Sequence, residues 1–180
     1  MTVNLRRPPT FALVASLALL SIGAITGGLL TVFQDSIYAA ARREIIKRPE
    51  VHRFAGTELI DQARITEVAD QSNTALRLLH THALGVGTLV LVGAVLIANL
   101  PLAVWLQTTL CALVSLGALY PIGWLLMAWF IPYLGVDALR PPVEMLIFLP
   151  FGAAIILGLV LAFLLSAAAL LRRFIDGKHE

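Results

Sequence analysis

The sequence predicts an all-α integral membrane protein, a four-helix bundle with both ends in the cytoplasm and a polar, partly helical outer segment. Composition is the first observation behind this class. Hydrophobic residues make up 59% of the 180 residues and charged residues only 13%, about half the charged share of an average soluble domain. The hydrophobic residues are also gathered into four runs, each long enough to cross a bilayer. We therefore expect a single membrane domain, residues 1–180.

The first apolar run covers residues 11–33. A helix of this length reaches about 35 Å, which spans the hydrocarbon core with some tilt. It is too long for the hydrophobic region of a cleaved signal peptide, so we expect a retained signal anchor. The other spans are expected at about 76–98, 102–130 and 143–171. The third is long and contains Pro121, which predicts a kink.

A polar segment, residues 34–75, separates the first two spans. Its basic and acidic residues nearly balance, as on a solvated helix surface. Residues 36–48 are expected to continue the first helix, and residues 57–79 to run straight into the second span. Pro49 and Gly56 mark the break between these two helical parts.

The distribution of basic residues predicts the orientation. Arg6 and Arg7 precede the first span, and a second basic group follows the fourth span. Four spans place both ends on one side, and the positive-inside rule makes that side the cytoplasm. Residues 34–75 and a short loop at residues 132–142 are then outside. Residue usage rich in Ala, Leu and Arg favours a bacterial inner (cytoplasmic) membrane, crossed several times.

Several classes of function lack their sequence signals. There is no clustered basic surface for nucleic acid, so we expect no nucleic-acid partner. The single cysteine, Cys111, lies within an apolar run and is expected to be a buried hydrophobic residue. The chain has no nucleophile elbow, phosphate-binding loop, Cys-x-x-Cys pair or dinucleotide fingerprint.

His80 and His82 are the residues whose type and place point most directly to chemistry. Both lie at the outer end of the second span, where ionisable side chains are uncommon and point to function. Residues two apart on a helix differ in direction by about 200°, so the two rings cannot bind one ion together. Small residues beside them, including Gly85 and Gly87, make room either for a haem or for another helix. Arg77, one turn before His80, is placed to meet a haem propionate or a lipid phosphate.

A metal site is a second possibility for the histidines. His52 in the outer segment, either His80 or His82, and an outer carboxylate such as Glu144 would together suit copper or zinc. Spacing alone does not show that these residues converge. Purely structural roles for the histidines are the third possibility.

The stretch from Leu79 to Gly93 combines His-x-His with a glycine-rich apolar run. It resembles the second helix of haem–copper oxidase relatives. It is also similar to a group of small bacterial four-helix membrane proteins of uncharacterised function, whose second helix starts with Leu-His-Thr-His. The oxidase resemblance implies that His80 or His82 is an axial ligand of haem b. It also implies a second axial histidine on another span, where this chain has none, so Met127, Met145 or a partner would have to supply that ligand.

Two functions follow as hypotheses. The first is a non-catalytic accessory or scaffold subunit of a bacterial membrane complex, with a redox-linked complex as one option. Its partners would be the lipid bilayer and a membrane protein or further copies of the chain, docked on glycine-containing faces such as that of Gly23 and Gly27. The alternative is a haem- or copper-binding protein that uses His80 or His82 in electron transfer or oxidase assembly. Histidine in only one span favours the first hypothesis.

Overall fold

The computed structural model describes residues 5–176, which form helices and no strand. Four of its helical stretches are long and apolar enough to cross a membrane, which confirms the prediction of an all-α chain with four helices of membrane-spanning length. The third and fourth stretches are each divided by a short segment of altered helical geometry. The elements are α1 (Thr10–Ile46), α2 (Glu58–Ala98), α3 (Val104–Leu116), η1 (Gly117–Leu119), α4 (Tyr120–Leu134), α5 (Val136–Val143), η2 (Glu144–Phe148) and α6 (Leu149–Asp176).

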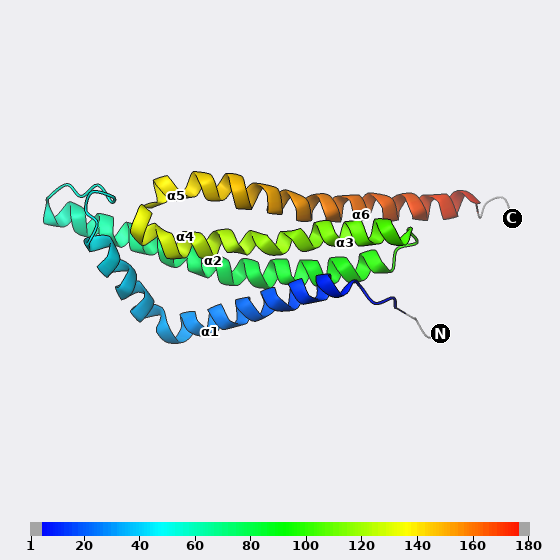
Figure 1. The fold of residues 1–180 in the computed structure, drawn as a ribbon, viewed down its shortest axis with the longest axis horizontal. Coiled ribbons are helices and arrows are strands. Elements are labelled where there is room, and N and C mark those ends of the chain that lie inside the picture. The colour runs from blue at the N-terminus through cyan, green and yellow to red at the C-terminus, as the bar shows by residue number, and fades with distance from the viewer. Residues whose placement is uncertain (1–4, 177–180) are drawn as a thin grey trace.

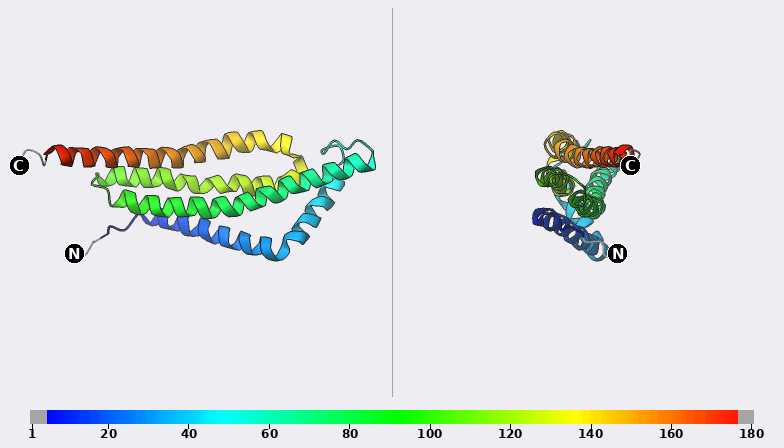
Figure 2. Two further views of the ribbon diagram at one scale, coloured as in Figure 1. Left: turned by 180° about the vertical axis from the view of Figure 1, so that it is seen from behind. Right: turned by 90° about the vertical axis from the view of Figure 1, so that its right-hand side faces the viewer.

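The long helices lie side by side, with α2 and the α3–α4 stretch in the middle (Figure 1). The end-on view places α1 on one side of this central pair and α6 on the other (Figure 2). Accordingly, α1 packs mainly against α2, and α6 mainly against α3. Residues 5 and 176 lie at the same end of the molecule (Figure 1), as an even number of spans requires.

The polar segment is helical on both sides of a single break, as predicted. The first helix continues to Ile46, and the second begins at Glu58 and runs without interruption to Ala98. The intervening turn is irregular, and Gly56 within it has a φ of 77°, a conformation that glycine adopts without steric cost. We call residues 34–75 and 135–144 the head. In the head, α1 and α2 extend beyond the apolar region.

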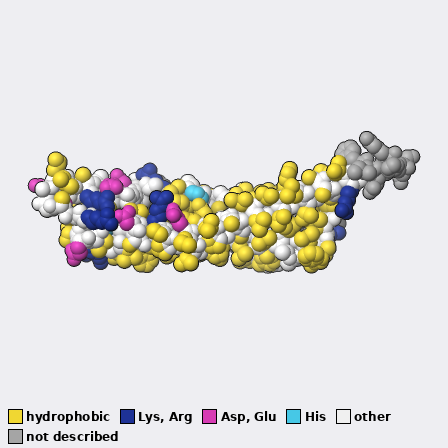
Figure 3. All heavy atoms as spheres, turned by 90° about the horizontal axis from the view of Figure 1, so that it is seen from above, with side chains coloured by type: hydrophobic (Ala, Val, Ile, Leu, Met, Phe, Trp, Pro, Cys, Tyr) yellow, Lys and Arg dark blue, Asp and Glu magenta, His cyan; other side chains and the backbone are white. Residues whose placement is uncertain are grey.

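The head has its own hydrophobic core. Side chains from α1, α2, α4 and α5 meet there, including Ile45, Val68, Ile131 and Leu139. Figure 3 shows charged side chains gathered at the head end, an apolar belt beside them, and Lys or Arg again at the opposite end. This distribution matches a helix bundle that crosses a bilayer and carries a folded head at one surface.

The irregularity in the third span lies just before Pro121. Because proline has no N–H, the carbonyl of Gly117 cannot accept the regular helical hydrogen bond from residue 121. The N–H of Tyr120 bonds to that carbonyl instead, and residues 117–119 tighten into the 3₁₀ segment η1. The expected proline effect is therefore present, and it satisfies the backbone within the span, as a bilayer demands.

The prediction of a loop at residues 132–142 was wrong. Pro132 lies inside α4, Pro141 and Pro142 lie inside α5, and only Gly135 separates the two helices. Gly135 has a φ of 75°, which lets the chain turn within one residue. The two adjacent prolines remove N–H donors from the helix, and η2, a π-helical segment, follows them directly. The helix thus continues past the prolines with a local widening, in which the N–H of Leu149 bonds to the carbonyl of Glu144.

Candidate functional site

His80 faces α1. Its Nδ1 lies 2.8 Å from the carbonyl oxygen of Gly23, so this nitrogen donates, because a carbonyl can only accept. The ring fills the space beside Gly27. A Cβ atom placed on Gly27 would lie 2.6 Å from Cε1 of His80 and 3.3 Å from Nε2. The His80 ring therefore packs between α2 and α1, and its Nδ1–H is hydrogen-bonded to the backbone of α1.

His82 faces the opposite side of α2, as the two-residue spacing predicts. Its Nδ1 donates to the carbonyl of Leu78 at 2.8 Å. Its ring lies beside two aromatic rings of α4, with centroid distances of 5.5 Å to both Tyr120 and Trp124. The two histidines thus join α2 to different neighbouring helices.

His52 is buried in the head, where 1% of its surface is exposed. Its Nε2 lies 3.1 Å from the carbonyl oxygen of Pro132, in the last turn of α4. Carbonyls in the last turn of a helix have no intrahelical donor. His52 supplies that donor, while its own carbonyl accepts a hydrogen bond of 3.2 Å from Nε of Arg64. These bonds fix the turn between α1 and α2 onto the end of α4.

The remaining predicted site residues lie apart from the histidines. Arg77 is exposed on α2 and forms no ion pair among the described residues. Glu144 begins η2 and accepts a hydrogen bond of 2.6 Å from Nε of Arg140. Within residues 5–176, no three His, Cys, Asp or Glu side chains are grouped closely enough to hold a metal ion. The structure therefore does not bring His52, His80 or His82 and Glu144 together.

The surroundings of His80 do not fit a haem. Haem ligation would need an open space beside the ring, and the space that Gly27 leaves is filled by the His80 ring itself, with Cε1 and Nδ1 nearest. The glycine on the same face of α2, Gly87, is likewise filled, because a Cβ there would meet Leu19 and Leu20 at 3.1–3.3 Å. A second helix occupies the room that the small residues make, which is the other reading of such faces.

The α1–α2 interface accounts for most of the predicted small-residue faces. Gly23 packs against Leu84, whose side chain would lie 2.7 Å from an added Cβ. Ser16 donates a buried hydrogen bond of 2.8 Å to the carbonyl of Gly87. These faces dock α1 onto α2 within one chain, so the docking role expected of Gly23 and Gly27 is already filled internally.

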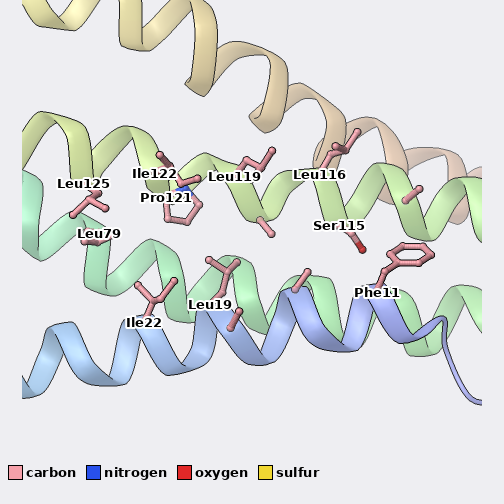
Figure 4. Close-up of a pocket in the computed structure, with 14 residues that line it drawn as sticks. Phe11, Leu19, Ile22, Leu79, Ser115, Leu116, Leu119, Pro121, Ile122 and Leu125 are labelled. Carbon is pink, nitrogen blue, oxygen red and sulfur yellow. The ribbon is translucent and has the colours of Figure 1, made fainter.

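An apolar groove of about 620 Å³ opens on another side of α1, between that helix and the α3–α4 stretch. Figure 4 shows Leu19 and Ile22 of α1 facing Leu119 and Ile122 across it. Small side chains keep the groove wide. Its lining comprises Phe11, Ala15, Ala18, Leu19, Ile22, Leu79, Ala112, Ser115, Leu116, Ala118, Leu119, Pro121, Ile122 and Leu125.

Ser115 is the polar exception in this groove. Its hydroxyl is buried and has no hydrogen-bond partner among the described residues, and it points into the groove in Figure 4. Several other hydroxyls of the spans bond to the carbonyl four residues before them. Thr108 does so at 2.9 Å and Ser166 at 2.6 Å. A hydroxyl without a hydrogen-bond partner is costly in an apolar setting. The Ser115 hydroxyl therefore indicates that the groove lacks a binding partner.

The groove was not predicted from the sequence. A signal was present in Ala15, Ala18 and Ile22, which recur at helical spacing on one face of the first span. Helical spacing identifies a face but not what covers it. Only the packing of α1 against α2 shows that this second face is left open.

The chain was compared with protein-family models, with curated proteins and with solved structures, and nothing matched it in any of the three comparisons.

Proposed function

We propose that this protein is a non-catalytic accessory or scaffold subunit of a membrane complex in the bacterial inner membrane. It docks a transmembrane helix of a partner subunit, or of a second copy, in the apolar groove between α1 and the α3–α4 stretch. One observation carries this proposal: the unpartnered hydroxyl of Ser115 in an otherwise apolar groove lined by small residues.

The chemistry of the groove favours a helix over a lipid chain. Alanines at positions 15, 18, 112 and 118 allow a neighbouring backbone to approach closely. A helix also carries carbonyls and polar side chains that can accept a hydrogen bond from Ser115. An acyl chain carries no such group, and it would leave the hydroxyl unsatisfied in hydrocarbon.

The proposed orientation places both ends in the cytoplasm and the head outside. Basic residues at positions 6, 7, 172, 173 and 178 support it, because they lie at the two ends of the chain and the cytoplasmic side of a membrane protein carries an excess of Lys and Arg. In the head, basic and acidic residues nearly balance. The head is then free to contact a second protein outside the membrane.

Co-purification tests the docking surface. The tagged chain would be extracted from its native membrane in a mild detergent as wild type, as Ala18→Trp and as Ala153→Trp. Ala18 lines the groove, whereas Ala153 is exposed on α6. We expect one defined partner with the wild type and with Ala153→Trp, and its loss with Ala18→Trp because the indole fills the groove. Equal recovery with all three would contradict the proposal.

The haem or copper alternative retains one supporting observation. Nδ1 of His82 is held by Leu78, which leaves the lone pair of Nε2 available, as on many metal-ligating histidines. A second ligand would have to come from a partner. An absorption spectrum and metal analysis of the intact complex test this alternative. A Soret band or stoichiometric copper that disappears in His82→Ala would favour it, and a colourless, copper-free complex would remove it.

A further inference from the structure

A second hollow, which we call the cleft, lies where the head meets the apolar belt, between α2, α4 and the α5–η2 corner. Its volume is about 740 Å³, within the range of sites for small organic molecules. The cleft reaches from Glu67 and Asp70 in the head to Leu78 in the second span. Any molecule held along it would thus have one end among charged groups and the other among apolar groups.

The deeper part of the cleft is aromatic. Phe148 of η2 lies against both aromatic residues of α4, with centroid distances of 4.9 Å to Tyr120 and 4.6 Å to Trp124. This position of Phe148 requires Gly123, because a Cβ there would collide with the phenyl ring. All three aromatic rings are only partly buried, so part of their surface is available to a ligand. These rings therefore offer an apolar aromatic surface to the body of a ligand.

The rim of the cleft is acidic. It contains Glu67, Asp70 and Glu144 and one basic residue, Arg140. Glu144 is paired with Arg140, and Glu67 with Arg64, which lies outside the lining. Asp70 forms no ion pair among residues 5–176.

The Asp70 carboxylate affects the pKa of a nearby tyrosine, Tyr38. Burial raises the pKa of the Tyr38 phenol and the nearby Asp70 carboxylate raises it further, whereas Arg42 acts to lower it. The rim therefore includes one carboxylate, Asp70, that forms no ion pair within the described part of the chain.

Two lining residues also carry polar atoms without a partner. Oε1 of Gln71, an acceptor, and Nε1 of Trp124, a donor, are buried and form no hydrogen bond among the described residues. Both atoms are enclosed in the lining, so the recognition of a ligand rests on the Asp70 carboxylate and the aromatic surface. No three carboxylates or histidines are close enough to bind a metal ion within the described part of the chain, so the geometry favours a single organic cation.

We propose that the cleft binds an amphiphilic organic cation, an amine or quaternary ammonium group with an apolar body. The cationic group lies beside Asp70 at the rim, and the apolar body extends along the rings of Trp124 and Tyr120 at the level of Leu78. The cation is supplied either by a membrane lipid with an amine headgroup or by a freely diffusing hydrophobic amine. This binding activity is independent of the groove between α1 and α3.

Trp124 provides the means to test the proposal. The other two tryptophans, Trp105 and Trp129, are 69% and 66% exposed, so a Trp105→Phe, Trp129→Phe chain retains its packing and leaves one fluorescent reporter in the cleft. This chain would be titrated with hexyltrimethylammonium in an uncharged maltoside detergent. Hexanol and hexanesulfonate are the neutral and anionic controls. We expect a saturable change in Trp124 fluorescence with the cation alone.

Two further substitutions identify the binding residue. Asp70→Asn keeps the size of the side chain and removes its charge, and we expect about tenfold weaker binding, equivalent to roughly 1.4 kcal/mol. Asp35→Asn removes an exposed acid of α1 that does not line the cleft, and binding should not change. An equal response to hexanol, no saturable response, or unchanged affinity in Asp70→Asn would each overturn the proposal.

The source of the cation is found by repeating the titration in nanodiscs. Discs of phosphatidylglycerol alone contain no amine, whereas discs with phosphatidylethanolamine do. Weaker apparent binding of hexyltrimethylammonium in the second discs identifies a lipid headgroup as the natural occupant. Equal binding in both identifies a diffusing amine.

Discussion

Gly27 is the residue at which a side chain on α1 would disturb the packing of α2 most directly. An added Cβ would lie 2.6 Å from the imidazole of His80, whereas the next residue, Gly28, has nothing within 4 Å. We expect Gly27→Ala to destabilise the protein by about 1–3 kcal/mol, the usual cost of overpacking. Gly28→Ala should instead be neutral or stabilising by up to about 1 kcal/mol, because alanine is the better helix former.

Thermal unfolding followed by circular dichroism in one detergent would compare these two variants. A similar loss of stability in both would show that His80 does not occupy the space beside Gly27. The pair is informative because the substitutions are chemically identical and one residue apart. They therefore differ only in what the new methyl group meets.

His52 provides a second prediction at the residue scale. Replacing it with alanine leaves the Pro132 carbonyl without its donor, and an unmet buried acceptor costs about 1–3 kcal/mol. His52→Gln retains an N–H donor and should lose less stability than His52→Ala. Differential scanning fluorimetry of the two variants measures the order. If both lose equally, the hydrogen bond to Pro132 contributes little and packing alone explains the burial of His52.

The histidines also show how far sequence reasoning reached at this scale. The opposed directions of His80 and His82 follow from helix geometry alone, and the structure shows the two rings on opposite sides of α2. The partners of those rings do not follow, because they belong to α1 and α4, which are distant in sequence. His52 was a candidate metal ligand for the same reason: nothing near it in the chain indicates that Pro132 would need a donor.

The third span is the element that carries the central proposal. Its Ser115 hydroxyl lacks a partner, in contrast to Thr108, which bonds to its own helix. We expect Ser115→Ala to leave the isolated chain as stable as the wild type, or more stable by up to about 1 kcal/mol, because it removes an unsatisfied polar group. The same variant should retain less partner during purification.

Unfolding of the isolated chain and partner recovery would be measured on the same preparation. Thr108→Ala is a suitable comparison, since its side chain is exposed and its bond is local. It should affect neither quantity strongly. A marked loss of stability of the isolated chain in Ser115→Ala would mean that the hydroxyl already has a partner within the protein.

Among the elements, sequence predicted the long helices best and the proline-rich segments worst. The break near Pro49 and Gly56 and the disturbance before Pro121 were both expected. The stretch from Pro132 to Pro142 was expected to be a loop and is almost entirely helical. Prolines there were read as helix breakers. In the structure, the Ser72 hydroxyl donates at 2.7 Å to the Ala128 carbonyl, which Pro132 leaves without its helical donor.

At the scale of the whole molecule, the arrangement leaves α1 attached mainly through α2. A closed bundle would cover the second face of α1 with another span of the same chain. Here α6 lies on the far side of the central pair (Figure 2), and the groove remains open. Composition and run length predict four spans, but they contain no information on which helices become neighbours, so this opening was not predictable from the sequence.

The most direct test of the central proposal is site-specific photo-cross-linking in native membranes. Benzoylphenylalanine would replace Ala118, which lines the groove, or Ala153, which is exposed on α6. We predict one discrete protein adduct from position 118, absent from position 153 and abolished when Ala18→Trp is added. Lipid adducts alone at position 118, or the same protein adducts from both positions, would contradict a helix-docking subunit.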